Sequence, residues 1–294
     1  MEQELGLIGL GNAGLALAAP ILKQYSIVGF DLDPARCALA ANMGVKVVAS
    51  ARALAQRCEI VLLSLPNPAI SKSVLEAIGA DALAKRTVVE TSTVTPEDIE
   101  ALLAIAAPAG ASIVESAIIG GVHKLAAGEG TFLVAAAEQD YRRVEPILQA
   151  AAEKIFFLGP LGNAMRAKLV CNGVAHAVMV VIIEAAALAA AQNVPLDVFY
   201  ELMRRDSGLM RPLTHRFGER ILKQDFEGGM STTNARKDSA LILDVAKNLG
   251  VPLFATAAAH SVYEIAMREG LEKLDYAAIS KLWEKWLGVS FAAK

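Results

Sequence analysis

Short apolar stretches alternate with longer amphipathic ones through the first half of the chain. The pattern predicts strands at residues 5–8, 26–30, 45–48, 60–65, 87–90, 112–115, 131–135 and 155–158. Helical patterns lie between most of them, for example at residues 34–42 and 138–151. Because strands that alternate with helices build βαβ units, their sheet is parallel. We therefore expect an α/β fold with a doubly wound parallel sheet.

The pattern changes after residue 162, where only helices are predicted. They cover residues 164–192, 197–204, 212–222, 231–248 and 256–268. The first is far longer than an ordinary helix, and its nearly continuous apolar surface requires burial on several sides. We predict a sheet domain at residues 1–162, followed by a long interdomain helix that opens an all-α substrate and dimerisation domain at residues 163–294.

The apolar run at residues 174–191 also has the length of a membrane span. Glu184 lies near its middle, and a central acid costs about 2.5 to 3.5 kcal/mol on insertion scales, which the alanines of the run barely offset. A helix buried in protein is therefore favoured. Because 54% of the residues are apolar, one monomer cannot cover this surface. We expect a homodimer or homotetramer and no membrane partner.

Charge and composition argue against several other classes of protein, such as nucleic-acid-binding, secreted and metal-binding proteins. The formal net charge is −3 with no long basic run, which argues against nucleic acid as a partner. The acidic amino terminus lacks the features of a secretory signal, so we expect a cytoplasmic protein. Three cysteines without a Cys-x-x-Cys pair suit a reduced compartment, and we interpret them as buried thiols. The four histidines show no metal-ligand spacing, so no metal site is predicted.

A glycine-rich turn, Gly9-Leu10-Gly11-Asn12-Ala13-Gly14, follows the first strand and opens a helix. Its first glycine permits a tight turn, its second lets a pyrophosphate approach the backbone, and its third lets helix pack on strand. Asp31 follows the second strand, where a carboxylate can accept hydrogen bonds from ribose hydroxyls and repel a 2′-phosphate. Asp31 could instead start the next turn, because Asp33-Pro34 is predicted to be a helix cap followed by a first-turn proline. The first interpretation predicts NAD as the cofactor, in preference to NADP.

Polar loops follow later strands at Leu65-Pro66-Asn67 and at Thr91–Glu97. Because the carboxyl ends of the strands face the ligand in doubly wound sheets, both loops should border the nicotinamide. Helix capping by Thr95 explains part of the second loop and leaves Thr93 free to contact the cofactor. The pair Gly120-Gly121 can present backbone N–H groups to a substrate carboxylate, or form a bare turn.

Two polar clusters lie on the predicted helices. Lys168 and Asn172 are four residues apart near the start of the long helix, so they share one face and can point into a cleft. A solvated helix end would explain the lysine equally well. Lys237-Asp238 lies in a later charged cluster, which also suits a solvated helix face.

This ordered set of motifs resembles the β-hydroxyacid dehydrogenase family, the 3-hydroxyisobutyrate dehydrogenase-like enzymes, which are related to 6-phosphogluconate dehydrogenase and the imine reductases. The resemblance covers essentially the whole chain. It implies a Rossmann-type domain, Lys168 as general acid/base, Asn172 as a substrate-orienting residue and Lys237 near the cofactor. It also implies that Gly120-Gly121 and the residue before them, Ile119, bind the substrate.

The chain departs from the family at two places that bear on the site. The family's Asp-Ala-Pro-Val-Ser-Gly-Gly stands here as Glu115–Gly121, so that Ile119 replaces a serine, and Ala164 replaces the second glycine of the lysine motif. The resemblance implies hydride transfer between nicotinamide and a 3-hydroxy acid or semialdehyde. An apolar pocket would suit a ketone or imine reductase instead, and a non-catalytic cofactor-binding relative is the second alternative.

Overall fold

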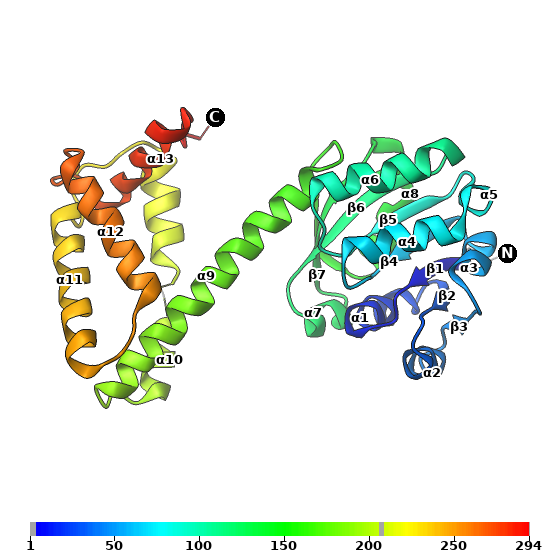
Figure 1. Cartoon of the computed structure of the whole chain (residues 1–294), viewed down its shortest axis with the longest axis horizontal. Coiled ribbons are helices and arrows are strands. Elements are labelled where there is room, and N and C mark those ends of the chain that lie inside the picture. The colour runs from blue at the N-terminus through cyan, green and yellow to red at the C-terminus, as the bar shows by residue number, and fades with distance from the viewer. Residues whose placement is uncertain (1–3, 206–208, 294) are drawn as a thin grey trace. The chain divides into compact units, whose positions relative to one another are not determined.

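The computed structural model describes residues 4–205 and 209–293. The chain divides into two compact units, residues 1–173 and 174–294 (Figure 1). The division falls inside the long helix, after residue 173, whereas the sequence pattern places it at residue 162.

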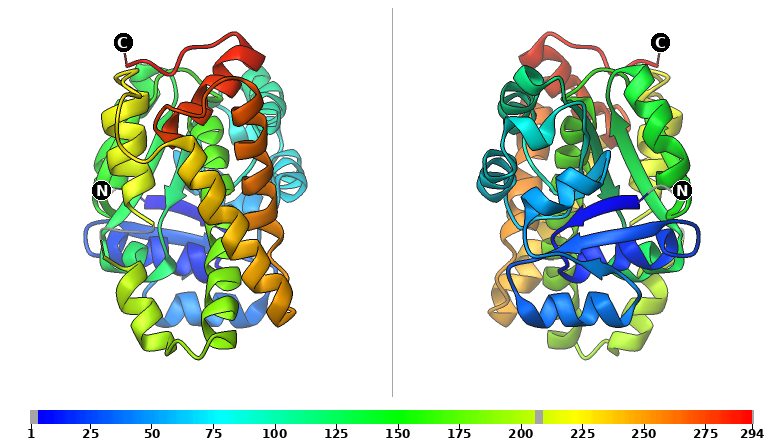
Figure 2. Two further views of the ribbon diagram at one scale, coloured as in Figure 1. Left: turned by 90° about the vertical axis from the view of Figure 1, so that its left-hand side faces the viewer. Right: turned by 90° about the vertical axis from the view of Figure 1, so that its right-hand side faces the viewer.

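The first unit is built on an eight-stranded sheet with the order β3-β2-β1-β4-β5-β6-β7-β8. The right-hand view of Figure 2 shows β1 and β2, in blue, side by side. All neighbouring strands are parallel except β6 and β7. The strands are β1 (Glu4–Ile8), β2 (Ser26–Phe30), β3 (Lys46–Val47), β4 (Ile60–Leu63), β5 (Thr87–Glu90), β6 (Ser112–Ile119), β7 (Gly130–Ala135) and β8 (Ala152–Phe157).

The antiparallel β6–β7 pair departs from the predicted parallel sheet. Residues 120–129 connect the two strands, and a parallel crossover needs about a dozen residues or more. The short connection therefore reverses the chain direction. Strand β6 also continues to Ile119, beyond the predicted end at Glu115, because its last residues pair with β7. As a result, the glycine pair follows the strand directly.

Helices cover both faces of the sheet. One apolar core, which includes Leu54 and Leu75, packs α3, α4 and α6 on one face, and a second core, which includes Leu17 and Leu148, packs α1 and α8 on the other. The helices of this unit are α1 (Asn12–Ile21), α2 (Pro34–Asn42), α3 (Ala51–Arg57), α4 (Pro68–Ile78), α5 (Ala80–Leu83), α6 (Pro96–Ala106), the 3₁₀ turn η1 (Ala107–Ala109), α7 (Val122–Ala127) and α8 (Glu138–Gln149).

The helix caps predicted at Asp33 and Thr95 are confirmed. Asp33 accepts a hydrogen bond from the Ala35 N–H at 2.8 Å. Thr95 and Asp98 form a reciprocal capping box, in which each side chain accepts from the backbone N–H of the other. These caps fix where α2 and α6 begin, and thereby shape the loops that precede them.

The second unit is helical, as predicted. It contains most of α9 (Asn163–Ala191), α10 (Leu196–Met203), the π-helix η2 (Pro212–Ile221), α11 (Thr232–Leu249), α12 (Phe254–Arg268), the 3₁₀ turn η3 (Tyr276–Ile279) and α13 (Ser280–Leu287). The final helix α13 is absent from the sequence prediction.

Glu184 connects α9 to α12 within the second unit. Its carboxylate accepts hydrogen bonds from the N–H groups of Ala255 and Thr256, at 2.8 and 3.1 Å, and from the Thr256 hydroxyl. Burial raises the pKa of Glu184, but these donors outweigh it and the pKa is lowered overall. By length and composition alone α9 could also cross a membrane. The acid in its middle, however, has the role of a cap for α12.

The interpretation of all three cysteines as buried thiols is wrong. Cys58 is buried and Cys37 is partly buried, but Cys171 is exposed. The side chains of α9 are mostly exposed from Leu169 onward, and Cys171 lies in that stretch.

Candidate active site

The glycine turn between β1 and α1 forms one wall of a cavity. Gly9 has a φ of +94°, and a Cβ there would collide with the backbone of Ser64. A Cβ on Gly14 would collide with the Gly9 carbonyl, whereas one on Gly11 would meet open space. Gly11 caps α1 without a side-chain hydrogen bond, so the first N–H groups of the helix remain available to an anion. This turn fits a pyrophosphate.

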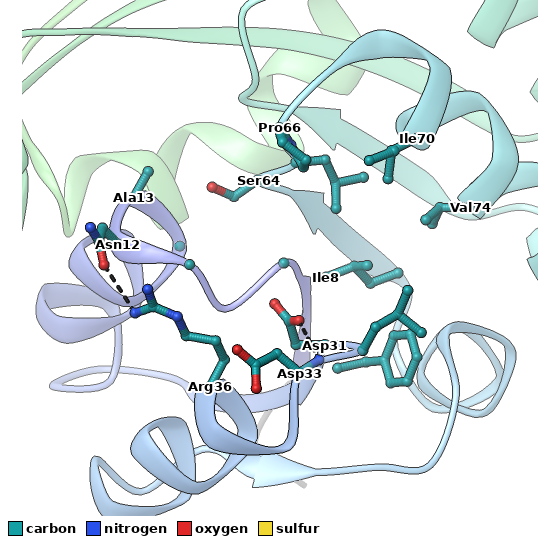
Figure 3. A pocket seen from close by; sticks show the side chains of 16 residues that line it. Ile8, Asn12, Ala13, Asp31, Asp33, Arg36, Ser64, Pro66, Ile70 and Val74 are labelled. Atoms are coloured by element: carbon teal, nitrogen blue, oxygen red, sulfur yellow. Dashed lines mark hydrogen bonds between the residues drawn. The ribbon is translucent and has the colours of Figure 1, made fainter.

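Asp31 is held at the end of β2 by backbone donors. Its Oδ2 accepts from the Leu10 N–H at 2.7 Å and its Oδ1 from the Asp33 N–H at 2.9 Å. The carboxylate thus lies beside the glycine turn (Figure 3). Across the cavity Arg36 Nη1 donates to Asn12 Oδ1 at 3.0 Å. Because each carboxylate oxygen has a further acceptor site, Asp31 can also accept from ribose hydroxyls.

Two cavities lie next to each other along the carboxyl edge of the sheet. The first, of about 470 Å³, is lined by the glycine turn, by Asp31 and by the apolar side chains of Ile70 and Val74 on α4. The second, of about 300 Å³, is lined by residues 91–93 and by the glycine pair. Both cavities share Ala13, Ser64, Leu65 and Pro66. Two joined cavities suit the two halves of a dinucleotide.

Lys168 reaches the end of β6 from the first turns of α9. Its Nζ donates to the backbone carbonyl of Ile118 at 2.5 Å, and the Ile118 side chain lines the second cavity. Burial lowers the pKa of the Lys168 ammonium from its usual value. Lys168 itself is not among the residues that line the second cavity, so its contact with a ligand there stays a prediction.

Glu115 anchors the start of α9. This fully buried side chain accepts hydrogen bonds from the Gly162 N–H and, at 2.9 Å, from the Met165 N–H. Burial raises the pKa of the carboxyl, and the backbone donors act against that rise. The bonds tie α9 to β6, so Glu115 fixes the helix turn that carries Lys168.

Two family models together cover most of the chain. Residues 4–159 match the NAD binding domain of 6-phosphogluconate dehydrogenase, and residues 162–283 match the NAD-binding region of NADP-dependent 3-hydroxyisobutyrate dehydrogenase. The chain belongs to the β-hydroxyacid dehydrogenase family. It is therefore an NAD(P)-dependent oxidoreductase.

Similar proteins match along nearly the full length. The 2-(hydroxymethyl)glutarate dehydrogenase of Eubacterium barkeri is 28% identical over 291 residues, which cover 98% of this chain and 97% of that protein. A 3-hydroxyisobutyrate dehydrogenase structure from Salmonella typhimurium is 26% identical with a TM-score of 0.67, covering 96% of this chain and 100% of the other. An imine reductase structure from a Pseudomonas species is 21% identical with a TM-score of 0.88, covering 96% and 99%, and shares the fold.

Within this β-hydroxyacid dehydrogenase, the isoleucines at the end of β6 have different surroundings. Successive strand residues point to opposite faces of a sheet. Ile118 lines the second cavity and packs against the core of α1 and α8, whereas Ile119, like Leu65 and Ala167, packs against the other core. Gly120 and Gly121 line the second cavity, and their contact with a substrate carboxylate stays a prediction. The substrate contact of Ile119 stays a prediction.

The remaining residues that were predicted to bind cofactor or substrate lie in different parts of the structure. Thr93 is exposed and lines the second cavity, while Asn67 caps α4 by accepting from the Ile70 N–H at 3.0 Å. Asn172 is half-buried, one turn beyond Lys168 on α9. Lys237 belongs to the second unit, where its Nζ lies 3.0 Å from Asp238 Oδ1. Contacts of Asn67, Asn172 and Lys237 with cofactor or substrate stay predictions.

Sequence reasoning missed Arg36 and the role of Glu115, and it included Ser92 only as part of the loop at residues 91–97. A charged residue at the end of an otherwise apolar strand is a signal that could have identified Glu115. Arg36 carries no such signal, because its contact with Asn12 depends on how two loops meet. Among residues 4–205 and 209–293, no three His, Cys, Asp or Glu side chains come together as a metal site.

Proposed function

We propose that the protein interconverts a 3-hydroxy acid and the corresponding semialdehyde, with Lys168 as general acid/base. The observation that carries this proposal is the position of Lys168 Nζ, 2.5 Å from the Ile118 carbonyl at the end of β6. The glycine pair that lines the adjoining cavity is suited to a carboxylate, because its N–H groups are free of bulky side chains.

The chain's own residues then handle the proton while the nicotinamide, when bound, exchanges the hydride. In the oxidation direction neutral Lys168 takes the hydroxyl proton of the substrate as its carbinol carbon loses hydride. In the reduction direction the ammonium of Lys168 donates that proton to the carbonyl oxygen. Asn172, one turn further along α9, would hold the substrate oxygen by its side-chain amide.

We further propose that NAD is the preferred cofactor. Asp31 places a carboxylate beside the glycine turn, where it repels a 2′-phosphate. The next residue, Leu32, lines the same cavity with 87% of its surface exposed and offers no charge to a phosphate. Arg36 also lines this cavity, but its guanidinium donates a hydrogen bond to Asn12 in the glycine turn.

A ketone or imine reductase is the second candidate. The second cavity is lined in part by the apolar residues Ile118, Val122 and Leu125, which would favour a larger and less polar substrate. The dehydrogenase relatives and the presence of Lys168 argue against the second alternative, a non-catalytic cofactor-binding protein.

A spectrophotometric panel separates these candidates. It would contain short 3-hydroxy acids, semialdehydes, bulky ketones and cyclic imines, each with NAD(H) and NADP(H). The main proposal predicts the highest kcat/KM for a 3-hydroxy acid or semialdehyde with NAD(H). Turnover confined to ketones or imines would establish the reductase, and no turnover of any compound would favour the non-catalytic candidate.

We also propose that the protein is a cytoplasmic homodimer or homotetramer whose α9 is covered by protein. Within the described part of the second unit, the apolar core clusters contain few buried side chains, such as Phe226 and Leu282. Exposed apolar residues are numerous there, including Val180 and Ile183 on α9. An exposed apolar surface of this kind is typical of helices that a second copy of the chain covers in a homo-oligomer.

A further inference from the structure

Two buried acids lie side by side beneath the cavities. Glu90 at the end of β5 pairs in register with Glu115 on β6, and neither side chain is exposed to solvent. Neighbouring strands are about 4.8 Å apart, and residues in register point to the same face. The charges that shift their pKa values differ, Asp98 for Glu90 and Arg166 for Glu115, so each acid responds to its own surroundings.

The surroundings assign the negative charge to Glu115. Its two oxygens accept N–H groups at the start of α9, where the helix dipole favours an anion. Glu90 accepts from the Ser92 N–H through Oε1. Among the described residues, neither Glu90 Oε2 nor Ser71 Oγ of α4 has a hydrogen-bond partner that meets geometric criteria.

The pKa of Glu90 is raised, and so is that of Glu115, so the assignment of the charge rests on the hydrogen bonds and not on these directions. Burial raises the pKa of Glu90, more than the nearby hydroxyls of Ser92 and Ser71 lower it, and the negative charge of Asp98 on α6 adds to the rise. As a neutral acid, Glu90 carries a hydrogen that can turn toward Ser71.

Glu90 is connected to both loops of the second cavity. It holds the backbone of Ser92, and Ser92 Oγ in turn accepts the Leu65 N–H at 2.8 Å. Ser92 and Leu65 both line the second cavity, together with Thr93 and Pro66. Glu90 thus helps to set how residues 64–66 and 91–93 face each other, beside Thr91, whose N–H and hydroxyl both donate to the Leu63 carbonyl.

We propose that Glu90, as a neutral carboxylic acid, is a positioning residue for the nicotinamide half of the cofactor. It acts through Ser92 and Leu65 and touches neither cofactor nor substrate. The inference rests on the proposed function only in assigning the nicotinamide to the second cavity, and the adenosine and pyrophosphate to the first.

Calorimetric binding of NADH and of ADP-ribose tests this proposal. ADP-ribose lacks the nicotinamide, so it reports on the first cavity alone. We expect Glu90→Ala to weaken NADH about tenfold and to change ADP-ribose affinity by less than twofold. Glu90→Gln should keep NADH affinity within about threefold of wild type, because its amide is neutral and still accepts the Ser92 N–H.

Thr87→Val is the matched control, because it removes a buried hydroxyl from the other end of β5, where it accepts from Arg143. It should leave the affinities for both ligands unchanged. If Glu90→Ala fails to fold, Ser92→Ala removes the acceptor of the Leu65 N–H and should give the same selective loss.

Equal weakening of NADH and ADP-ribose by Glu90→Ala would overturn the proposal, and so would unchanged NADH binding or a Gln variant as weak as Ala. Both ligands bind without turnover, so an incorrect choice of substrate class leaves this test intact. Failure of the substrate panel and failure of this proposal are therefore distinguishable.

Discussion

At the scale of single residues, the site depends on what burial does to Lys168. A free lysine has a pKa of about 10.4 and is almost entirely charged at neutral pH. Burial disfavours the charged form and lowers the pKa. The same side chain can therefore be a base at moderately alkaline pH and an acid below it.

The pH dependence of turnover follows from the lowered pKa of Lys168. For the oxidation, kcat should rise with pH as Lys168 loses its proton, with a midpoint below about 10.4. For the reduction, kcat should fall through the same range, because the ammonium is the proton donor. Stopped-flow absorbance of NADH across pH 6 to 11 measures both limbs. A flat profile in either direction would exclude proton transfer by this lysine from the rate-limiting step.

Ile119 is the residue where substrate choice is predicted to change. A serine hydroxyl at this position would add one hydrogen bond to a substrate carboxylate, worth about 1.5 to 3 kcal/mol. Ile119→Ser should therefore raise kcat/KM about ten- to a hundredfold for short 3-hydroxy acids and lower it for the best substrate of the panel. Because Ile119 also packs on the core, the thermal midpoint of the variant should fall. An equal loss on every compound would make Ile119 a packing residue only.

At the scale of elements, the start of α9 connects sheet and chemistry. The sequence pattern located the long helix, its lysine and all eight strands of the described sheet, because apolar periodicity and glycine spacing are local signals. It did not predict that β6 continues to Ile119 or that Glu115 holds α9, because strand pairing and the contact between residues 115 and 162 are long-range. It also missed that Asn67 caps α4, and the predicted cofactor contact of Asn67 stays a prediction.

Glu115→Gln tests whether Glu115 positions the start of α9 and with it Lys168. The variant replaces a charged acceptor at a helix N-terminus by a neutral amide, which should cost about 1.5 to 3 kcal/mol of stability. The first turns of α9 should shift, so kcat should fall about tenfold or more while ADP-ribose affinity is retained. Differential scanning calorimetry and steady-state kinetics measure the two effects. A destabilised variant with unchanged kcat would show that Glu115 contributes to folding without positioning Lys168.

At the scale of the whole molecule, the two units have unequal cores. The sheet unit has an extensive apolar core on each face, whereas the described part of the helical unit buries few apolar side chains of its own. The sequence indicated this imbalance through the apolar surface of the long helix. The number of subunits cannot be read from the same pattern, since any covering surface satisfies it.

Multi-angle light scattering measures the assembly directly. At micromolar concentration the mass should be two or four times the 31.0 kDa of one chain. Replacing Val180 and Ile183 of α9 by glutamate should shift the mass toward that of the monomer, because buried carboxylates at an interface are costly. A wild-type protein that elutes as a monomer would refute the proposed assembly.

The central claim is that Lys168 transfers the proton. Lys168→Ala should lower kcat about 10²- to 10⁴-fold, the range expected for loss of a general acid/base, and leave NADH affinity within about threefold. Lys72→Ala, which removes an exposed lysine on α4, is the control and should keep full activity. Parallel measurement of kcat and of the NADH dissociation constant for these variants is the most direct test. A Lys168→Ala enzyme with wild-type kcat would contradict the account.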